Sequence, residues 1–205
     1  MHKPLRQYRA VKMLTLLVFL LTLVAISLTL WVESEAEHND ELLVAGAQVR
    51  ALVLYHPSRD AQLSDDLSLA VVDGLRGAGF SVRRATMTRH MTATPTGFGL
   101  IVVVSNTYWW TPDLPTLRYL ARARFDGVPL VGLIGGAGAT GRSQRLLGQA
   151  LTATGAKVLG THSFWLFRPN DALATNEPNR RVAIRMAKQV ATESGAASLA
   201  LGVSK

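Results

Sequence analysis

Two short segments of this 205-residue chain combine residue types that can hold a flat or anionic ligand. Aromatic side chains can cover the face of a ring, and glycines let backbone N–H groups approach anionic or ring atoms closely. The candidate residues are Asn106, Thr107, Tyr108 and Trp109 in the first segment and Gly136, Ala137 and Gly138 in the second.

Each of these segments directly follows a run of apolar residues, at 98–105 and at 128–134. Such runs are typical of parallel strands that are buried on both faces. Further strands are predicted at 49–55, 80–85 and 157–160, and amphipathic helices at 63–78, 114–121, 141–154 and 179–192. Asp113 is the expected N-cap of the second of these helices. Five strands alternating with helices predict a three-layer α/β domain with a parallel sheet, whose ligands bind beyond the carboxyl ends of the strands.

A third polar loop follows the first predicted strand, at residues 56–64. Pro57 fixes the backbone there and removes one hydrogen-bond donor. His56 is expected to be solvated in this loop, because no other histidine or carboxylate stands at metal-ligand spacing from it. Hydroxyl, amide and guanidinium groups near a helix N-terminus suit an anion. The candidate residues in this loop are Ser58, Arg59, Gln62 and Ser64.

The three loops together resemble those of the flavodoxin-like family, over about residues 49–192. Residues 105–109 read Ser-Asn-Thr-Tyr-Trp and resemble the family's Ser/Thr-Pro-Thr-Tyr-Trp loop, with Asn106 in place of the usual proline. Residues 135–141 resemble its glycine-rich loop, and residues 58–62 resemble the Thr-Arg-Asp-Gly-Gln variant of the protoporphyrinogen oxidase branch. The resemblance implies a five-stranded parallel sheet of order 2-1-3-4-5 that binds FMN at a switch point.

The same resemblance implies a role for each loop. The residues named at 58–64 would hold the FMN phosphate, those at 106–109 would flank the isoalloxazine, and those at 136–138 would meet its polar edge. The implied function is FMN-dependent electron transfer or quinone/NAD(P)H oxidoreduction, with quinone, NAD(P)H or a redox protein as partner. Ala61 and Leu63 depart from the family's phosphate loop, which leaves a flavin-free interaction module as the alternative. No residue is assigned as a catalytic acid or base, and no metal site and no nucleic-acid partner are expected.

Several other features favour less specific roles. Residues 136–141 match G-x-G-x-x-G, but no acid follows near the end of the next strand, as a dinucleotide site requires. Ser143 lacks the G-x-S-x-G elbow of a hydrolase. His162 and Trp165 either line the same cleft or cap the core. Cysteine is absent, which excludes thiol catalysis and iron–sulfur clusters.

Residues 13–32 form an uncharged apolar run that, as a helix, spans roughly 30 Å, the thickness of one hydrocarbon core. Lys3, Arg6, Arg9 and Lys12 precede the run, so the positive-inside rule places the N-terminus in the cytoplasm and the domain outside. The alternatives are a cleaved signal peptide and a cytoplasmic domain. Membrane lipid is therefore an expected partner.

The charge distribution completes the expected organisation of the chain. The formal net charge is +8, yet residues 33–41 carry five acids and no Lys or Arg. We expect a cytoplasmic tail at 1–12, a membrane helix at 13–32, an acidic linker at 33–47 that ends in a short helix or turn at 41–47, a flavodoxin-like domain at 48–193 and a tail at 194–205. The tail is expected to be loose, with packing of Leu199 and Leu201 as the alternative.

Overall fold

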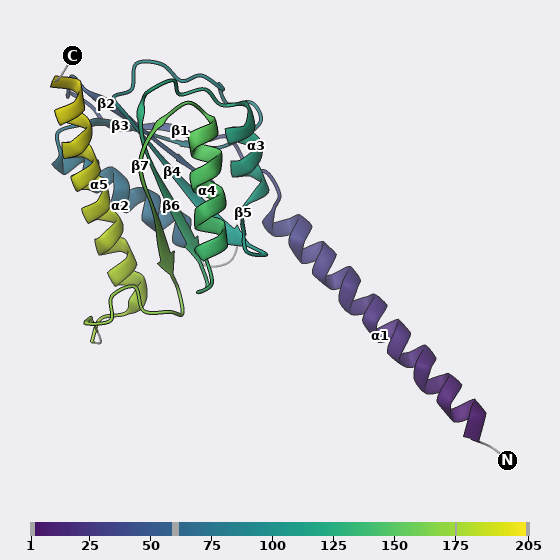
Figure 1. Ribbon diagram of the computed structural model, residues 1–205. Coiled ribbons are helices and arrows are strands. Elements are labelled where there is room, and N and C mark those ends of the chain that lie inside the picture. The colour runs from purple at the N-terminus through teal and green to yellow at the C-terminus, as the bar shows by residue number, and fades with distance from the viewer. Residues whose placement is uncertain (1–2, 59–61, 175, 204–205) are drawn as a thin grey trace. The chain divides into compact units, whose positions relative to one another are not determined.

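A computed structural model describes residues 3–58, 62–174 and 176–203 of the chain (Figure 1). The chain divides into two compact units, residues 1–34 and residues 35–205. Arg59 lies outside the described residues, and so do Ala61 and the ends of the chain.

The first unit contains one long helix, α1 (Lys3–Val32). Its segment Tyr8–Val32 has a mean hydropathy of 2.6 and is long and apolar enough to cross a membrane. A signal sequence near an N-terminus meets the same criterion of length and hydropathy.

The second unit is built on a mixed sheet whose central strands are parallel. These strands are β2 (Arg50–Tyr55), β3 (Ser81–Thr86), β4 (Leu100–Tyr108), β6 (Pro129–Gly136) and β7 (Lys157–Trp165). Their spatial order is β3-β2-β4-β6-β7, which is the predicted order 2-1-3-4-5. β7 is longer than the predicted 157–160, and the segment between β3 and β4 is irregular, as its threonines and Pro95 suggest.

The described sheet also has two strands that the sequence did not predict. β1 (Asp40–Val44) pairs antiparallel with β3 at one edge, and β5 (Thr111–Pro112) pairs antiparallel with the end of β4. The prediction of a five-stranded, purely parallel sheet was therefore incomplete. The residues expected to form an acidic linker at 33–47 include this edge strand, because Leu42, Leu43 and Val44 alternate too weakly between faces to be recognised.

Helices cover both faces of the sheet (Figure 1). α2 (Leu63–Gly77) and α5 (Asn179–Val203) pack together on one face, and α3 (Leu114–Arg122) and α4 (Gly141–Ala153) lie on the other. Close packing of α2 against α5 requires Gly74, since a Cβ there would lie 2.4 Å from the carbonyl oxygen of Lys188. The result is the predicted three-layer sandwich.

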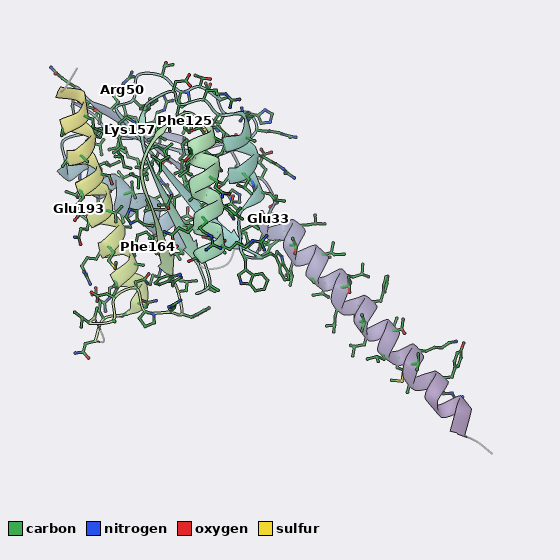
Figure 2. The ribbon with its side chains drawn as sticks, in the orientation of Figure 1. Glu33, Arg50, Phe125, Lys157, Phe164 and Glu193 are labelled. Atoms are coloured by element: carbon green, nitrogen blue, oxygen red, sulfur yellow. The ribbon has the colours of Figure 1, made fainter. Side chains whose placement is uncertain are left out.

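Strands β2, β4 and β6 are buried on both faces because their side chains alternate between two cores. On β2, Ala51, Val53 and Tyr55 pack in the α2/α5 core, while Leu52 and Leu54 pack in the α3/α4 core. Figure 2 labels one large aromatic from each core, Phe164 from the first and Phe125 from the second.

The last helix extends well beyond the predicted end at residue 192, so the expectation of a loose tail at 194–205 was wrong over the described residues. Ser198 Oγ donates a hydrogen bond to the carbonyl oxygen of Gly99 at 2.7 Å, and Leu199 packs against the core. Small residues allow this approach: a Cβ at Gly195 would lie 2.9 Å from Ala78 Cβ.

Candidate functional site

The candidate ring-binding loop is a tight hairpin at the carboxyl end of β4. Thr107 pairs with Pro112 and Tyr108 with Thr111, which leaves Trp109 and Trp110 as the two turn residues. Both tryptophans adopt left-handed backbone conformations, with φ of 49° and 59°. Positive φ at both central positions defines a type I′ turn, in which Asn-Gly is strongly preferred.

Placing two tryptophans in this turn is unfavourable by about 1–2 kcal/mol for each residue. Burial does not explain the choice, because Trp109 is 61% exposed and Trp110 is 55% exposed. Large exposed aromatic rings on a strained turn are typical of a surface that binds something. This hairpin is therefore the strongest candidate for a ligand or partner contact at this edge.

The glycine loop that follows β6 lies next to Thr107. A Cβ at Gly136 would lie 2.7 Å from Thr140 Cγ2 and 3.0 Å from Thr107 Cβ, so only glycine fits there. Thr107 Oγ1 is buried and has no hydrogen-bond partner among the described residues. Ala137 is exposed, and Gly138 is half-buried. The predicted loops thus do meet, and they place an unsatisfied hydroxyl group between them.

The continuation of β7 holds the glycine loop in place. Leu166 and Phe167 donate backbone hydrogen bonds to the carbonyl oxygens of Gly136 and Ala137, both at 3.0 Å. Trp165 Nε1 donates to Thr140 Oγ1 at 2.7 Å. Trp165 therefore supports the glycine loop, a role that differs from the two considered for it, which were lining the cleft and capping the core.

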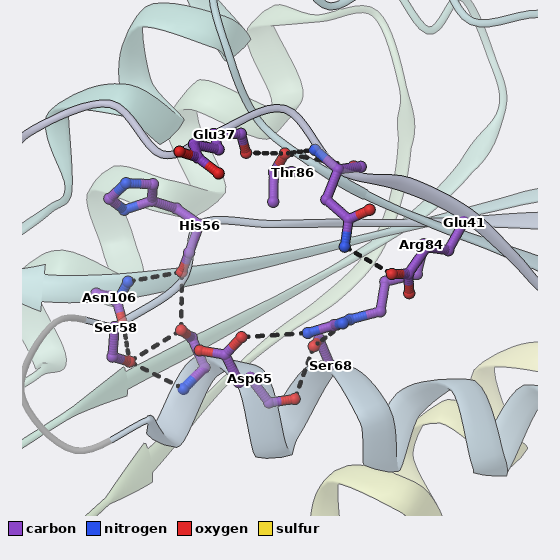
Figure 3. Close-up of polar contacts among 11 residues, drawn as sticks. Glu37, Glu41, His56, Ser58, Asp65, Ser68, Arg84, Thr86 and Asn106 are labelled. Carbon is purple, nitrogen blue, oxygen red and sulfur yellow. Dashed lines mark hydrogen bonds and ion pairs between the residues drawn. The ribbon is translucent and has the colours of Figure 1, made fainter.

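The candidate phosphate loop is closed on itself (Figure 3). Ser58 Oγ donates to Asn106 Oδ1 at 2.7 Å and accepts a hydrogen bond from the backbone N–H of Ser64 at 3.0 Å. Ser64 Oγ and Asn106 Nδ2 both donate to the carbonyl oxygen of His56, at 2.7 and 2.8 Å. Ser58, Ser64 and Asn106 are all buried. Their polar atoms therefore bind one another in this structure and do not face a ligand.

The remaining predicted site residues differ in their placement. Gln62 is exposed and lies at the N-terminal end of α2 with φ of 52°, a left-handed conformation. Tyr108 is half-buried at the end of β4. The role predicted for Arg59 falls on a residue outside the described range.

Asp113 connects three segments beneath these loops. Its carboxylate accepts hydrogen bonds from Ser105 Oγ at 2.8 Å, from the Asn106 backbone N–H at 2.7 Å and from the Thr116 backbone N–H at 2.9 Å. The last contact is the N-cap expected for α3. His56 Nδ1 lies 3.3 Å from Asp113 Oδ1, and both side chains are fully buried. The expectation that His56 is solvated was wrong, because the ring turns inward to this carboxylate.

The first turn of α2 carries two carboxylates that are paired with arginines. Asp65 Oδ1 accepts a hydrogen bond from Arg84 at 3.3 Å, and Asp66 Oδ2 accepts one from Arg180 at 2.5 Å. Arg84 is itself buried and donates to Ser68 Oγ (Figure 3). Its guanidinium lies 3.8 Å from the centre of the Tyr55 ring. Burial raises the pKa of Asp65 and of Tyr55, and the charge of Arg84 opposes both shifts. These carboxylates occupy the end of the helix dipole that favours negative charge.

No family model matches the chain, and no curated protein matches it by sequence. Solved structures do match. The chain is 16% identical to a metal-soaked flavodiiron core from Synechocystis, with a TM-score of 0.57, and covers 76% of its own length but 37% of that protein. It is 13% identical to a flavodoxin from the domain Archaea, with a TM-score of 0.51, and covers 71% of its own length and 99% of the flavodoxin.

A third match is a flavone reductase, at 12% identity and a TM-score of 0.58, with 75% of this chain and 64% of that one covered. At these identities the likeness concerns the fold. The chain has a flavodoxin-like fold, as the three loops predicted, with one additional N-terminal apolar helix.

Proposed function

We propose that this chain is a membrane-anchored, flavodoxin-like redox protein that binds FMN between the Trp109 hairpin and the glycine loop. The observation that supports this most strongly is the pairing of a strained, exposed tryptophan turn with a buried, unsatisfied Thr107 hydroxyl beside Gly136. Both features lie at the carboxyl edge of the sheet, where flavodoxin-like folds bind their ligands. The match of the fold to flavodoxins supports the same cofactor class.

The ring-binding residues of the chain fit a flat, partly polar ligand. Trp109 would cover one face of the ring and exclude water from it. Thr107 Oγ1 would exchange a hydrogen bond with a polar atom at the ring edge, and the backbone of residues 136–138 can approach the same edge because side chains do not obstruct it. The flavin, when bound, supplies the electron transfer itself. Quinone, NAD(P)H or a redox protein would exchange electrons with it.

The phosphate end of the site fits FMN less well than the ring end. Ser58 and Ser64 would have to give up their mutual contacts before their hydroxyl groups could bind phosphate oxygens. We therefore expect the ring to contribute most of the affinity, and the roles of Ser58, Arg59, Gln62 and Ser64 at a phosphate stay predictions.

We also propose that α1 anchors the domain in a membrane, with the N-terminus in the cytoplasm and the domain outside. Support comes from the four basic residues before the apolar run, against no Lys or Arg in the seventeen residues that follow it. A cytoplasmic domain is the alternative topology. A reporter fused after Lys205 decides between them, because the proposed topology predicts activity only outside the cytoplasm.

Fluorescence titration of FMN with the full chain in detergent micelles tests the flavin proposal. We expect saturable quenching with a dissociation constant below about 10 μM. Thr107→Val keeps the side-chain shape and removes only the hydroxyl, so it should weaken binding by about 5- to 10-fold. Trp109→Ala should weaken binding by about 10-fold. Trp110→Ala is the matched control and should leave the affinity within about 2-fold.

A second candidate function is a flavin-free interaction module on the same fold. The closed network of Ser58, Ser64 and Asn106 favours it, because these side chains need no ligand to satisfy their hydrogen bonds. Under this alternative the folded wild-type protein shows no saturable quenching by FMN, and the three variants bind FMN no differently from it.

A further inference from the structure

A separate polar cavity of about 250 Å³ lies between the segment after β3 and helix α3. It involves neither the tryptophan hairpin nor the glycine loop. The lining residues are Glu35, Thr88, Arg89, Pro115, Arg118, Tyr119 and Arg122.

Three arginines and one carboxylate give this cavity a positive charge. Arg122 Nη2 donates to the carbonyl oxygen of Thr88 at 2.7 Å, and its guanidinium lies 5.1 Å from the centre of the Tyr119 ring, so this side chain is fixed. Arg118 is exposed and makes no hydrogen bond or ion pair with any residue in the described part of the chain. Its donors are therefore available to a ligand.

The hydroxyl group of Thr88 is the second, independent indication of a ligand. Thr88 is 4% exposed, and its Oγ1 is buried without a hydrogen-bond partner among residues 3–58, 62–174 and 176–203. Leaving such a buried group without a hydrogen bond is unfavourable. A ligand oxygen in the cavity that Thr88 lines would satisfy it.

A carboxylate already occupies one side of this cavity. The backbone N–H of Arg89 donates to Glu35 Oε1, and Arg89 Nε lies 3.3 Å from Glu35 Oε2. The Arg89 side therefore binds anionic oxygens in this structure, while the Arg118 side has none. With three positive charges against one negative, the lining retains charge for a further anion.

We propose that this cavity binds a phosphate group, held by Arg118 and Arg122 and by the hydroxyl group of Thr88. The volume exceeds the roughly 30 Å³ of a single water several-fold, so a phosphate with a small substituent fits. Two sources carry this chemistry, a soluble phosphate ester and a phospholipid headgroup. Only Glu33 and Ser34 separate the last residue of α1 from Glu35 in the sequence, and the lipid source rests on the proposed anchoring of α1.

The test measures thermal unfolding of the full chain in maltoside detergent micelles, which carry no phosphate group, while inorganic phosphate is added at constant ionic strength. Because a ligand that binds only the folded state stabilises it, the wild type should show a saturable rise in Tm that chloride does not produce. Arg118→Ala should weaken the apparent phosphate affinity about 10- to 100-fold, since a hydrogen bond to a charged group is lost.

Thr88→Val distinguishes a loss of phosphate binding from a loss of stability. It removes a hydroxyl group that has no described partner, so the Tm without phosphate should stay the same or rise, while the phosphate affinity falls about 10-fold. Arg181→Ala is the matched control, because Arg181 is exposed on α5, on the other face of the sheet. It should respond to phosphate as the wild type does.

Nanodiscs that contain phosphatidic acid distinguish the two sources. If the headgroup is the ligand, the wild type is already stabilised there and added phosphate gives no further shift; if the ligand is soluble, the phosphate response is unchanged. Both results support the site. The proposal is overturned if phosphate acts no differently from chloride, or if Arg118→Ala and Thr88→Val respond as the wild type does. Neither variant should alter the FMN titration, so the proposal of a phosphate site and the proposal of a flavin site can be refuted independently of each other.

Discussion

Asp113 connects several segments of the chain near the candidate site. It is fully buried and accepts hydrogen bonds from β4 and from the first turn of α3, with His56 of the β2 loop beside it. Asp113→Ala should lower the free energy of unfolding by about 3–5 kcal/mol, because several buried donors lose their acceptor. Urea denaturation measures this.

The matched control for that variant is Asp73→Ala on α2. Asp73 pairs with Arg76 at 2.8 Å on the surface, where such a pair is worth roughly 0.5 kcal/mol. A loss below about 1 kcal/mol in Asp113→Ala would contradict the described network, since the N-cap alone contributes about that much.

His162 should make stability depend on pH. Burial lowers its pKa from the ordinary value of 6.5, with Glu193 opposing the shift. The unfolded chain then binds the proton more readily than the folded chain, so stability is fully present above about pH 6.5 and falls as the pH drops toward the lowered pKa. His162→Gln should flatten this decline.

The measurement compares urea midpoints of the wild type and His162→Gln between about pH 5 and pH 7.5, so that other titrating groups cancel. Asp65 contributes in the opposite sense, because its raised pKa favours the folded state at lower pH. Identical pH profiles for the two proteins would show that the partial burial of His162 does not lower its pKa.

Single-residue environments could be predicted only where local spacing determines them. The N-cap role of Asp113 follows from its position before an amphipathic helix, and the structure confirms it. The burial of His56 and the inward hydrogen bonds of Ser58 and Ser64 depend on Asn106 and Asp113, which lie about fifty residues away in the sequence. No local pattern specifies such contacts.

At the scale of elements, the turn of the β4–β5 hairpin should destabilise the fold while its exposed tryptophan rings contribute to binding. Trp110→Gly replaces a strained left-handed residue by the one that prefers this conformation, so the free energy of unfolding should rise by about 1 kcal/mol. Loss of the exposed ring should impair any partner contact that uses it. Urea denaturation of Trp110→Gly and of Trp110→Ala measures this. Both variants lack the ring, but only Trp110→Ala keeps the backbone strain, so their difference gives the effect of the strain alone.

A fall in stability of more than about 1 kcal/mol in Trp110→Gly would contradict this explanation. It would mean that the ring packs against the domain strongly enough to outweigh the backbone strain, despite being 55% exposed.

The elements that periodicity specifies strongly were predicted well. The buried strands and the amphipathic helices α2, α3 and α4 lie within a few residues of their expected bounds. β1 was missed because an edge strand buries little apolar surface. Its pairing with Arg83 and Arg84 of β3 also joins residues that lie far apart in the sequence, which no local pattern specifies. The end of α5 was missed because its small residues look loose until their packing partners are known.

At the scale of the whole molecule, retention of α1 would make the protein membrane-anchored, whereas its cleavage would make the protein secreted. Retention of α1 predicts that the chain resists extraction from membranes by alkaline carbonate, because the uncharged apolar run at residues 13–32 is long enough to span the bilayer and cannot leave it reversibly. Mature protein that begins near Glu37 and is recovered in the soluble fraction would show instead that the segment is a signal peptide.

The central claim is that the flavodoxin-like domain holds a redox-active flavin, and the visible spectrum of the protein tests it most directly. The full chain in detergent micelles is brought to equilibrium by dialysis against about 50 μM FMN, several times the expected dissociation constant, and is then reduced with dithionite and reoxidised in air. We predict about one flavin bound per chain in excess of the dialysis buffer, with absorption bands that bleach on reduction and return on reoxidation. A folded protein that holds no more flavin than the buffer would contradict the claim.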